Sequence, residues 1–342
     1  MSSIEARGLS GRWGRFSLRD VSLRVEAGEY MALIGPTGSG KTLLIETLAG
    51  FHSPEAGSVY IDDIDVTLWP PEKRSIGYVP QHQSLFPNMT VKENVEFGPR
   101  LRKMNEKDRS RKSCEVMEAL GIGHLSDRAP RGLSGGERQK VALARALVLE
   151  PKVILLDEPM SSVDAMAHRD LMAVLRETHN VSGATFVHVT HSHEEASVLA
   201  DTVGVLMGGR LRQSGAYMDV YRRPESSDVA ALLGFDNVYS VAGVSESVVE
   251  ISGKTLVHAD GRGFHAAWCG FRRESVEVHG KDLGGENVLE GKVTESLGVG
   301  DTGRFIIDAG ITIVASRRGE TFSVGEHVYV RVPRESIVLW GS

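Results

Sequence analysis

The segment from Gly35 to Thr42 constrains this 342-residue chain more than any other. It consists of Gly35-Pro36-Thr37-Gly38-Ser39-Gly40-Lys41-Thr42, which matches GxxxxGK[ST] without a gap. A β-rich apolar run, Tyr30–Ile34, precedes it, and a helical pattern, Thr42–Ala49, follows it. Glycines let such a loop curl around phosphate groups, and the helix that follows points its free N–H groups at them. The segment therefore predicts a phosphate-binding loop between a strand and a helix.

A second apolar run, Val153–Leu156, ends in the adjacent acids Asp157 and Glu158. In a P-loop protein, an acid at this strand end belongs to the Mg²⁺ shell, and the next acid can orient the attacking water. Asp157 is thus expected to bind Mg²⁺ with the Thr42 hydroxyl, and Glu158 to act in catalysis. Lys41 would reach the β- and γ-phosphates. These motifs alone predict a P-loop nucleoside triphosphatase and leave kinases, GTPases and helicases open.

Residues 1–233 alternate short apolar runs with helical patterns, which is typical of an α/β domain with a largely parallel sheet. Further strands are predicted at Thr185–Val189 and Val203–Met207, and helices at Gly135–Leu149 and Ala165–His179. Residues 234–342 instead carry short alternating stretches punctuated by glycine, which favours a small all-β, OB-like domain. The strands predicted there are Val238–Val244, Ser247–Ile251, Gly291–Glu295, Arg304–Ile307, Ile311–Ala315 and His327–Val332.

The predicted β domain contains an internal repeat. Asp236-Asn237-Val238 opens one half and Glu286-Asn287-Val288 opens the other. The halves end in Arg273-Glu274-Ser275-Val276 and Arg334-Glu335-Ser336-Ile337. A duplication predicts two similar barrels side by side, although strings this short also match by chance.

Composition excludes several classes of protein. The net charge of -6 offers no general attraction to nucleic acid. The two cysteines, Cys114 and Cys269, lack the spacing of a zinc site or of a disulfide framework. The first residues have no apolar core, and no run approaches the length that spans a bilayer. We therefore expect a soluble, cytoplasmic protein that meets a membrane only through a partner.

The string Leu133-Ser134-Gly135-Gly136-Glu137-Arg138-Gln139 decides among the P-loop classes. Ser134 and Glu137 match the S-x-x-E capping box, and a bare helix N-terminus is an anion site. A plain capped helix explains the serine and the glutamate but not both glycines. The string resembles the signature of the ABC ATPase family, in which the signature of one subunit closes on the ATP of the other. The resemblance implies a homodimer with two shared ATP sites, to which Ser134, Gly135, Gly136 and Glu137 contribute.

Other family motifs follow in register. Gln81, in Tyr78-Val79-Pro80-Gln81, matches the glutamine that contacts Mg²⁺ and water and links catalysis to the membrane partner. Ser161-Ser162-Val163-Asp164 matches the D-loop, which implies that Asp164 lies at the dimer seam. His191, in Val189-Thr190-His191, matches the switch histidine near the γ-phosphate. Trp13 stands where the family places an aromatic residue on adenine, with Phe16 as the alternative and core packing open for both.

The chain departs from the common pattern in places. Pro80 precedes Gln81 where an aromatic residue is frequent, Ser192 follows His191 where aspartate is usual, and the D-loop contains Ser162-Val163. None of these changes removes a catalytic group, so the resemblance still implies ATP hydrolysis.

An ATPase domain with a β-rich tail and no membrane span resembles an importer subunit. The segment Gln83-Ser84-Leu85-Phe86-Pro87-Asn88-Met89-Thr90-Val91 is unusually apolar for a loop. In importers the matching segment forms the groove that docks a permease helix, and core packing remains open for some of its side chains. The resemblance thus implies a permease dimer, an external substrate-binding protein and a place on the cytoplasmic face of the inner membrane.

The tail resembles the TOBE domain of molybdate, tungstate, sulfate, sugar and polyamine importer ATPases. The molybdate/tungstate group matches best, through Arg12-Trp13-Gly14-Arg15-Phe16-Ser17-Leu18, Gly28-Glu29-Tyr30 and Gly234-Phe235-Asp236-Asn237-Val238. Some members of that group are inhibited by the oxyanion they transport. Ser316, Arg317 and Arg318 are candidate oxyanion contacts because guanidinium forks and hydroxyls suit tetrahedral oxyanions. A solvated turn with two surface arginines explains them as well.

Two other classes of protein fit the sequence less well. A soluble ABC ATPase of DNA repair or translation would carry coiled coils, a zinc cluster or a second cassette, and the sequence contains no sign of them. A catalytically idle regulatory protein would not keep Lys41, Asp157, Glu158 and His191 together.

Overall fold

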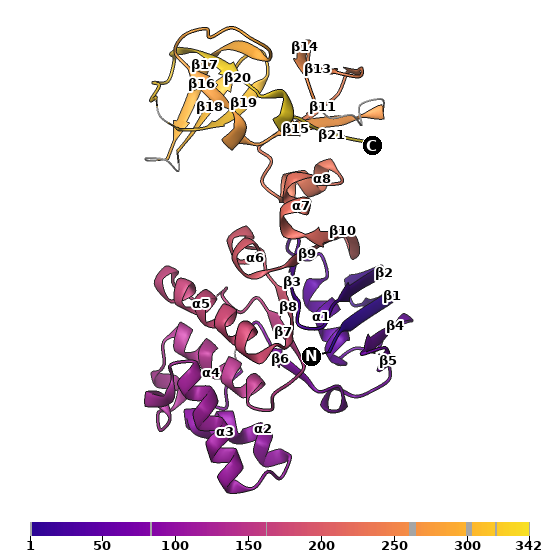
Figure 1. Cartoon of the computed structure of the whole chain (residues 1–342), viewed down its shortest axis with the longest axis vertical. Coiled ribbons are helices and arrows are strands. Elements are labelled where there is room, and N and C mark those ends of the chain that lie inside the picture. Colours follow the sequence, from indigo (N-terminus) through magenta and orange to yellow (C-terminus); the bar gives the residue numbers. More distant parts are fainter. Residues whose placement is uncertain are drawn as a thin grey trace. The chain divides into compact units, whose positions relative to one another are not determined.

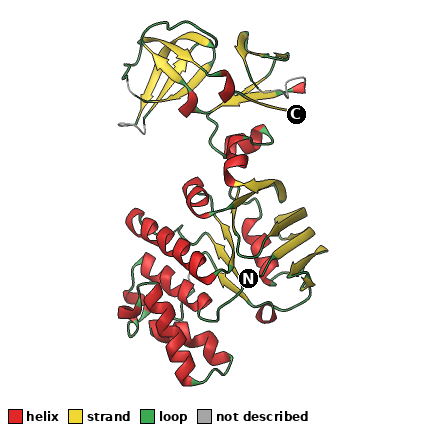
Figure 2. Cartoon of the chain, viewed as in Figure 1, coloured by secondary structure: helices red, strands yellow, loops and turns green. Residues whose placement is uncertain are grey.

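The computed structural model describes residues 2–82, 84–161, 163–259, 265–298, 303–318 and 320–341. The chain forms two compact units, Met1–Val220 and Tyr221–Ser342 (Figure 1). The first combines helices and strands, and the second consists mainly of strands (Figure 2). The division lies earlier than the predicted boundary between 233 and 234. Arg272 donates hydrogen bonds to the backbone oxygens of Tyr221 and Leu233, which ties the intervening residues to the second unit.

The first unit is built on a six-stranded sheet of order β10-β9-β3-β8-β7-β6. Its strands are β3 (Tyr30–Ile34), β6 (Ile76–Val79), β7 (Val153–Asp157), β8 (Thr185–Val189), β9 (Thr202–Met207) and β10 (Arg210–Ala216). Neighbours pair in parallel except β10, which runs antiparallel to β9. The largely parallel sheet predicted from the sequence is thus confirmed.

The helices of the chain are α1 (Lys41–Ala49), α2 (Val91–Leu101), α3 (Glu106–Ala119), α4 (Gly135–Leu147), α5 (Ala165–Ser182), α6 (His193–Leu199), α7 (Tyr217–Arg222) and α8 (Ser227–Leu232). A second, antiparallel sheet of order β2-β1-β4-β5 contains β1 (Ile4–Trp13), β2 (Phe16–Val25), β4 (Ala56–Ile61) and β5 (Ile64–Asp65). It lies across the parallel sheet from α4 and α5 (Figure 1).

Each face of the parallel sheet carries its own hydrophobic core, because successive side chains of a strand point to opposite faces. On β7, Val153 and Leu155 join the core formed with α1 and the antiparallel sheet, whereas Ile154 and Leu156 join the core formed with the helices opposite. A strand buried on both faces needs a continuous apolar run. This requirement explains why β3, β7 and β8 could be predicted closely from the sequence.

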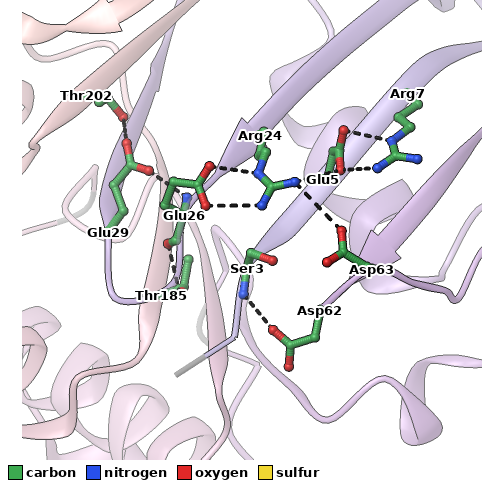
Figure 3. Close-up of polar contacts among 10 residues, drawn as sticks. All are labelled: Ser3, Glu5, Arg7, Arg24, Glu26, Glu29, Asp62, Asp63, Thr185 and Thr202. Atoms are coloured by element: carbon green, nitrogen blue, oxygen red, sulfur yellow. Dashed lines mark hydrogen bonds and ion pairs between the residues drawn. The ribbon is translucent and has the colours of Figure 1, made fainter.

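Polar contacts surround the turn between β2 and β3 (Figure 3). Arg24 pairs with Glu26 at 2.7 Å and approaches Asp63 at 3.7 Å. The Thr202 hydroxyl of β9 donates to Glu29, in the turn that leads into β3. Exposed ion pairs add little stability, so these contacts chiefly fix how β2 continues into β3 and hence where the phosphate loop begins.

The described residues of the second unit form three antiparallel sheets, of orders β11-β15-β21, β12-β13-β14 and β16-β20-β17-β18-β19. Its strands are β11 (Asn237–Ser240), β12 (Gly243–Val244), β13 (Val248–Ile251), β14 (Lys254–Val257), β15 (Trp268–Phe271), β16 (Glu277–His279), β17 (Val288–Leu297), β18 (Arg304–Asp308), β19 (Thr312–Ser316), β20 (His327–Arg331) and β21 (Val338–Trp340). One hydrophobic cluster runs through all three sheets. The expected small all-β domain is confirmed.

The two halves of the repeat exchange strands. The repeated Arg-Glu-Ser strings form matching 3-10 turns, Arg273–Ser275 and Arg334–Ser336. After the first turn, β16 crosses to pair with β20 of the second half, and after the second turn β21 pairs with β15 of the first half. The halves therefore share one core instead of standing as two separate barrels.

Two buried asparagines hold this exchange. Asn237, in the string that opens the first half, donates to the carbonyl oxygen of Val314 and accepts from its N–H, at 2.9 and 2.7 Å. Asn287, its counterpart, makes the same pair of bonds to Val257, at 2.7 and 2.6 Å. Each side chain thus acts as a strand partner for a residue of the opposite half, which is why an asparagine recurs at both positions.

Candidate functional site

The phosphate loop leaves β3 and enters α1 as predicted. Gly38 and Gly40 adopt φ angles of 81° and 102°, a left-handed conformation that favours glycine. A Cβ atom on Gly35 would lie 2.0 Å from the carbonyl oxygen of Leu206, so the first glycine is required by the close approach of β9. Gly40 is the N-cap of α1, and the free N–H groups of the first turn face the loop.

Lys41 is buried in the loop that it follows. Its Nζ donates to the carbonyl oxygens of Gly35 and Pro36 at 2.8 and 3.1 Å. Burial lowers the pKa of Lys41, while the charges of Glu158 and Asp157 oppose that shift. The ammonium group is therefore held among backbone oxygens and next to two acids, where an anionic phosphate can replace the carbonyls as its partner.

Asp157 and Thr42 meet behind the loop. The Thr42 hydroxyl donates to Oδ1 of Asp157 over 3.1 Å, and Asp157 is 2% exposed. Burial raises the pKa of Asp157 to about 6, and the charges of Glu158 and Glu46 add to this, against the hydrogen bond from Thr42. A desolvated carboxylate beside a hydroxyl is an oxygen donor set that suits a small, hard divalent cation. The residues present therefore fit the metal that the sequence predicts.

Glu158 is the meeting point of three loops. The Gln81 amide nitrogen donates to Oε2 of Glu158 over 3.1 Å, and Nδ1 of His191 lies 3.6 Å from the same oxygen. The backbone N–H of Glu158 donates to Val189, and its φ angle is 43°. This left-handed turn directly after β7 aims the carboxylate away from the core and toward Gln81 and His191. The structure thus brings together all three residues that the sequence predicts around the attacked phosphate.

A cavity of about 570 Å³ opens in front of these groups. We call it the P-loop cavity; it is lined by Trp13, Phe16, residues 37–42, Leu43, Glu46, His52, Gln81, Glu158 and His191. Glu46 and His52 were not predicted. Glu46 follows Thr42 by one turn of α1, so helical spacing alone could have indicated it. His52 pairs with Glu46 at 3.1 Å through a turn after α1 that the sequence does not reveal.

Both adenine candidates border the P-loop cavity. The Trp13 ring lies over Gly11, where a Cβ atom would approach Cη2 to 2.2 Å, and its centroid is 5.8 Å from that of His52. Trp13 also packs against the core under the antiparallel sheet. Phe16 is 38% exposed and lies beside Gly38. Both are therefore near the site, and a choice between them requires the mutants discussed below.

The signature string opens α4 as predicted. Ser134 accepts from the N–H of Glu137 over 3.2 Å, and Glu137 accepts from the N–H of Ser134 over 2.7 Å, which completes the capping box. A Cβ atom on Gly136 would lie 3.0 Å from Cβ of Ala167, so α5 packs closely against this glycine. No residue of the signature is among the described residues that line the P-loop cavity. Its role in a shared site stays a prediction.

Asp164 is the N-cap of α5 and accepts hydrogen bonds from the N–H groups of Met166 and Ala167. Ser162 of the same D-loop lies outside the described residues. Ser192, where the family usually has aspartate, caps α6 by accepting from the N–H of Glu195 over 3.2 Å. Serine and aspartate are both good N-caps, so this departure preserves the turn at His191.

The candidate oxyanion residues lie together at the end of β19. Ser316 ends the strand, and the Arg317 guanidinium lies 6.0 Å from the centre of the Phe305 ring. Arg318 is exposed and donates to the carbonyl oxygen of Glu274 over 3.4 Å. These contacts are compatible with a surface turn as well as with an anion site, so the oxyanion assignment stays a prediction.

A family model described as "ABC transporter" matches residues 18–161. The molybdate/tungstate import ATP-binding protein WtpC of Pyrococcus horikoshii is 39% identical over 305 residues, which cover 89% of this chain and 87% of that protein. The chain belongs to the family of ABC transporter ATP-binding subunits. The sulfate/thiosulfate import ATP-binding protein CysA 1 of Rhizobium meliloti is 37% identical over 315 residues, 90% of each chain.

Solved structures agree with this family and with its P-loop fold. A dimeric ATP-binding cassette in a post-hydrolysis state, bound to ADP and phosphate, is 28% identical with a TM-score of 0.56. The match covers 63% of this chain and 98% of that one. Among the described residues, no helix is long and apolar enough to cross a bilayer.

Proposed function

We propose that this ABC subunit hydrolyses ATP with Mg²⁺ to power an importer, and that its cargo is molybdate or tungstate. The observation that carries the motor function is the P-loop cavity, where Lys41, Glu158 and His191 converge on one site. Family membership supports ATP as the nucleotide. The donor pair Thr42 and Asp157 supports Mg²⁺, which in such a site neutralises developing charge on the phosphates.

The residues divide the chemistry among them. The loop N–H groups and Lys41 bind the phosphates. Oε2 of Glu158, held by the Gln81 amide, positions the attacking water and accepts its proton. His191, next to the same carboxylate, donates to the γ-phosphate. Gln81 adjoins the apolar docking segment, so its contact with Glu158 offers a route from a permease to the water-positioning group.

We infer a homodimer with two shared sites. Ser134 and the glycines after it present the N-terminus of α4, an anion-binding position that the P-loop cavity of the same chain does not use. The solved relative is described as a dimer, which supports this arrangement. Asp164 would lie at the seam, next to the ATP that the partner's signature covers.

A permease dimer is the partner that would turn hydrolysis into transport. In the segment after Gln81, Leu85 packs on the core and Phe86 packs against Phe97 at 4.4 Å between ring centres. Both side chains remain half-buried. One side of each residue therefore packs on the protein, and the other leaves apolar surface that a permease helix would contact. The subunit would sit on the cytoplasmic face of the membrane, with an external substrate-binding protein delivering the cargo.

The cargo assignment rests on the names of relatives. WtpC proteins from three organisms match at 39 to 44% identity and are described as molybdate/tungstate importers. Sulfate/thiosulfate relatives reach comparable coverage, so sulfate is the second candidate. The β unit would sense the same oxyanion through Ser316, Arg317 and Arg318.

The test is ATP hydrolysis by the full chain, reconstituted with its permease and binding protein and supplied with molybdate, tungstate, sulfate, maltose or spermidine. Lys41→Ala should abolish hydrolysis, whereas Lys107→Ala, at an exposed lysine of α3, should not. Stimulation by molybdate- or tungstate-loaded binding protein supports the proposed cargo, and stimulation by sulfate alone refutes it. Arg317→Ala should abolish inhibition by internal oxyanion while Arg334→Ala preserves it; equal responses would exclude the sensing role.

A further inference from the structure

A buried hydrogen-bond network joins the turn at His191 to the start of α5, outside the lining of the P-loop cavity except for His191 itself. Its centre is Glu195 of α6, which is 6% exposed. Oε1 of Glu195 lies 2.8 Å from Nε2 of His168. Oε2 accepts a hydrogen bond from the Thr190 hydroxyl over 2.6 Å and lies 3.3 Å from Nε2 of His188. One carboxylate therefore contacts three side chains, from α5, from β8 and from the loop that follows β8.

The charge state of Glu195 follows from these donors. Burial alone would raise the pKa of Glu195, but the adjacent His188 and the hydrogen bonds from Thr190 and His168 outweigh burial and lower it to about 2. His188 is fully buried, and its Nδ1 lies 3.0 Å from the Tyr30 hydroxyl. Burial raises the pKa of Tyr30. The hydroxyl thus keeps its proton and is the hydrogen-bond partner of Nδ1, while Nε2 on the other side of the ring faces Glu195.

Glu195 holds the turn at His191 from both sides. The Thr190 hydroxyl that donates to Glu195 also accepts from the N–H of Ser192 over 2.9 Å and so spans His191. Ser192 in turn caps the helix that carries Glu195. Nδ1 of His191 faces Glu158 at 3.6 Å. A displacement of the Glu195 carboxylate would therefore change the backbone that aims His191.

The other oxygen of Glu195 contacts the first turn of α5, which follows the D-loop. His168 lies in the first turn of α5, and its backbone N–H donates to the carbonyl oxygen of Asp164 over 2.8 Å. Asp164 caps that helix through its side chain. Glu195 therefore forms hydrogen bonds both with Thr190, the residue before His191, and with His168, in the helix turn that follows Asp164.

We propose that Glu195 is a positioning residue for ATP hydrolysis. It fixes the position of the His191 turn relative to the start of α5. The histidine aimed at the phosphate then moves together with the loop predicted to face the partner subunit. A carboxylate is needed because it accepts from Thr190 with one oxygen and from His168 with the other, whereas glutamine has one acceptor oxygen and would place an N–H group against a donor. The inference rests on the proposed ATPase function.

The matched pair Glu195→Gln and Glu194→Gln tests this role, because Glu194 is the exposed neighbour on the same helix. Loss of charge-assisted hydrogen bonds predicts a fall in kcat of roughly tenfold or more for Glu195→Gln, with KM for ATP unchanged. Glu194→Gln should match the unaltered chain. His168→Leu should lose activity and His168→Gln, which retains an N–H donor, should recover it. A rise in KM without loss of kcat, or equal activity of both His168 variants, would overturn the proposal.

A double-mutant cycle separates this role from general stability. If Glu195 acts through His191, then Glu195→Gln causes no further loss of kcat in a His191→Ala background. The same fold-loss in both backgrounds would show that Glu195 acts independently of His191 and would refute the proposal. Absence of ATP turnover by the unaltered, folded chain would refute the ATPase function itself, so the two failures are distinguishable.

Discussion

The Thr42 hydroxyl donates to the Asp157 carboxylate over 3.1 Å and so joins the first turn of the P-loop helix to the end of β7. Burial raises the pKa of Asp157 and so favours its protonated form. In the chain alone, the hydrogen bond from Thr42 is the largest contribution that favours the ionised form. The pair therefore carries an electrostatic cost that a bound cation would relieve. This cost can be measured without any nucleotide.

Asp157→Asn is expected to stabilise the nucleotide-free chain at pH 7 while abolishing hydrolysis. The ordinary pKa of 3.8 is raised to about 6 in the folded chain, so the folded state retains this proton to higher pH than the unfolded state. Stability from this group therefore falls as pH rises from about 4 to about 6. The full shift corresponds to about 3 kcal/mol, and asparagine removes the penalty while keeping the acceptor for Thr42.

Urea unfolding at pH 4 and pH 7 measures this effect. The stability gap between Asp157→Asn and the unaltered chain should be present at pH 7 and shrink at pH 4. Asp170→Asn, at an exposed position of α5, serves as the control and should show no such gap. A gap of the same size at both pH values would mean that ionisation of Asp157 is not its cause.

Trp13→Ala should raise KM for ATP and leave kcat nearly unchanged, because stacking binds the ground state and the transition state equally. Loss of one aromatic–base stack is worth about 1–3 kcal/mol, or roughly 5- to 150-fold in affinity. Phe16→Ala is the matched variant from the same cavity wall. A larger rise in KM for Phe16→Ala than for Trp13→Ala would reassign the adenine contact to Phe16.

Asn237→Ala and Asn287→Ala should each destabilise the second unit by about 1–3 kcal/mol, because each leaves a buried backbone donor and acceptor without a partner. The second unit's unfolding transition, followed by denaturant titration of the full chain, measures the loss. Asn105→Ala in the first unit, which removes an N-cap of α3, should leave that transition unchanged. Loss confined to one of the two asparagine variants would contradict an exchange in which both halves take part.

The parts of the fold that were predictable from sequence are those with a local cause. The strands Tyr30–Ile34 and Thr185–Val189 were predicted with the bounds that the structure has, since a strand buried on both faces appears as an apolar run. The capping box at Ser134 was predictable because its partner lies one helical turn away. In the tail, the predicted strand Val238–Val244 is in fact two short strands, β11 and β12, that belong to different sheets.

The features that could not be predicted depend on residues that are distant in the sequence. The strands β14, β15, β16 and β21 are three or four residues long, and the last two take their pairing from the other half of the repeat. In the sequence, Glu195 cannot be distinguished from an ordinary surface glutamate of a helix. Its role becomes visible only because the fold places His168 and His188 beside it. The catalytic residues were predicted better. The acid after an apolar strand indicates Glu158, the resemblance to the family implies Gln81 and His191, and the fold then brings the three together.

Phosphate release by the purified full chain measures ATP hydrolysis at this site. Glu158→Gln removes the water-positioning carboxylate but keeps its size, so turnover should fall at least about 100-fold while ATP binding persists. Gel filtration with ATP should then show this variant as a trapped dimer, whereas Glu194→Gln turns over ATP like the unaltered chain. Unchanged phosphate release by Glu158→Gln would show that hydrolysis does not depend on this carboxylate.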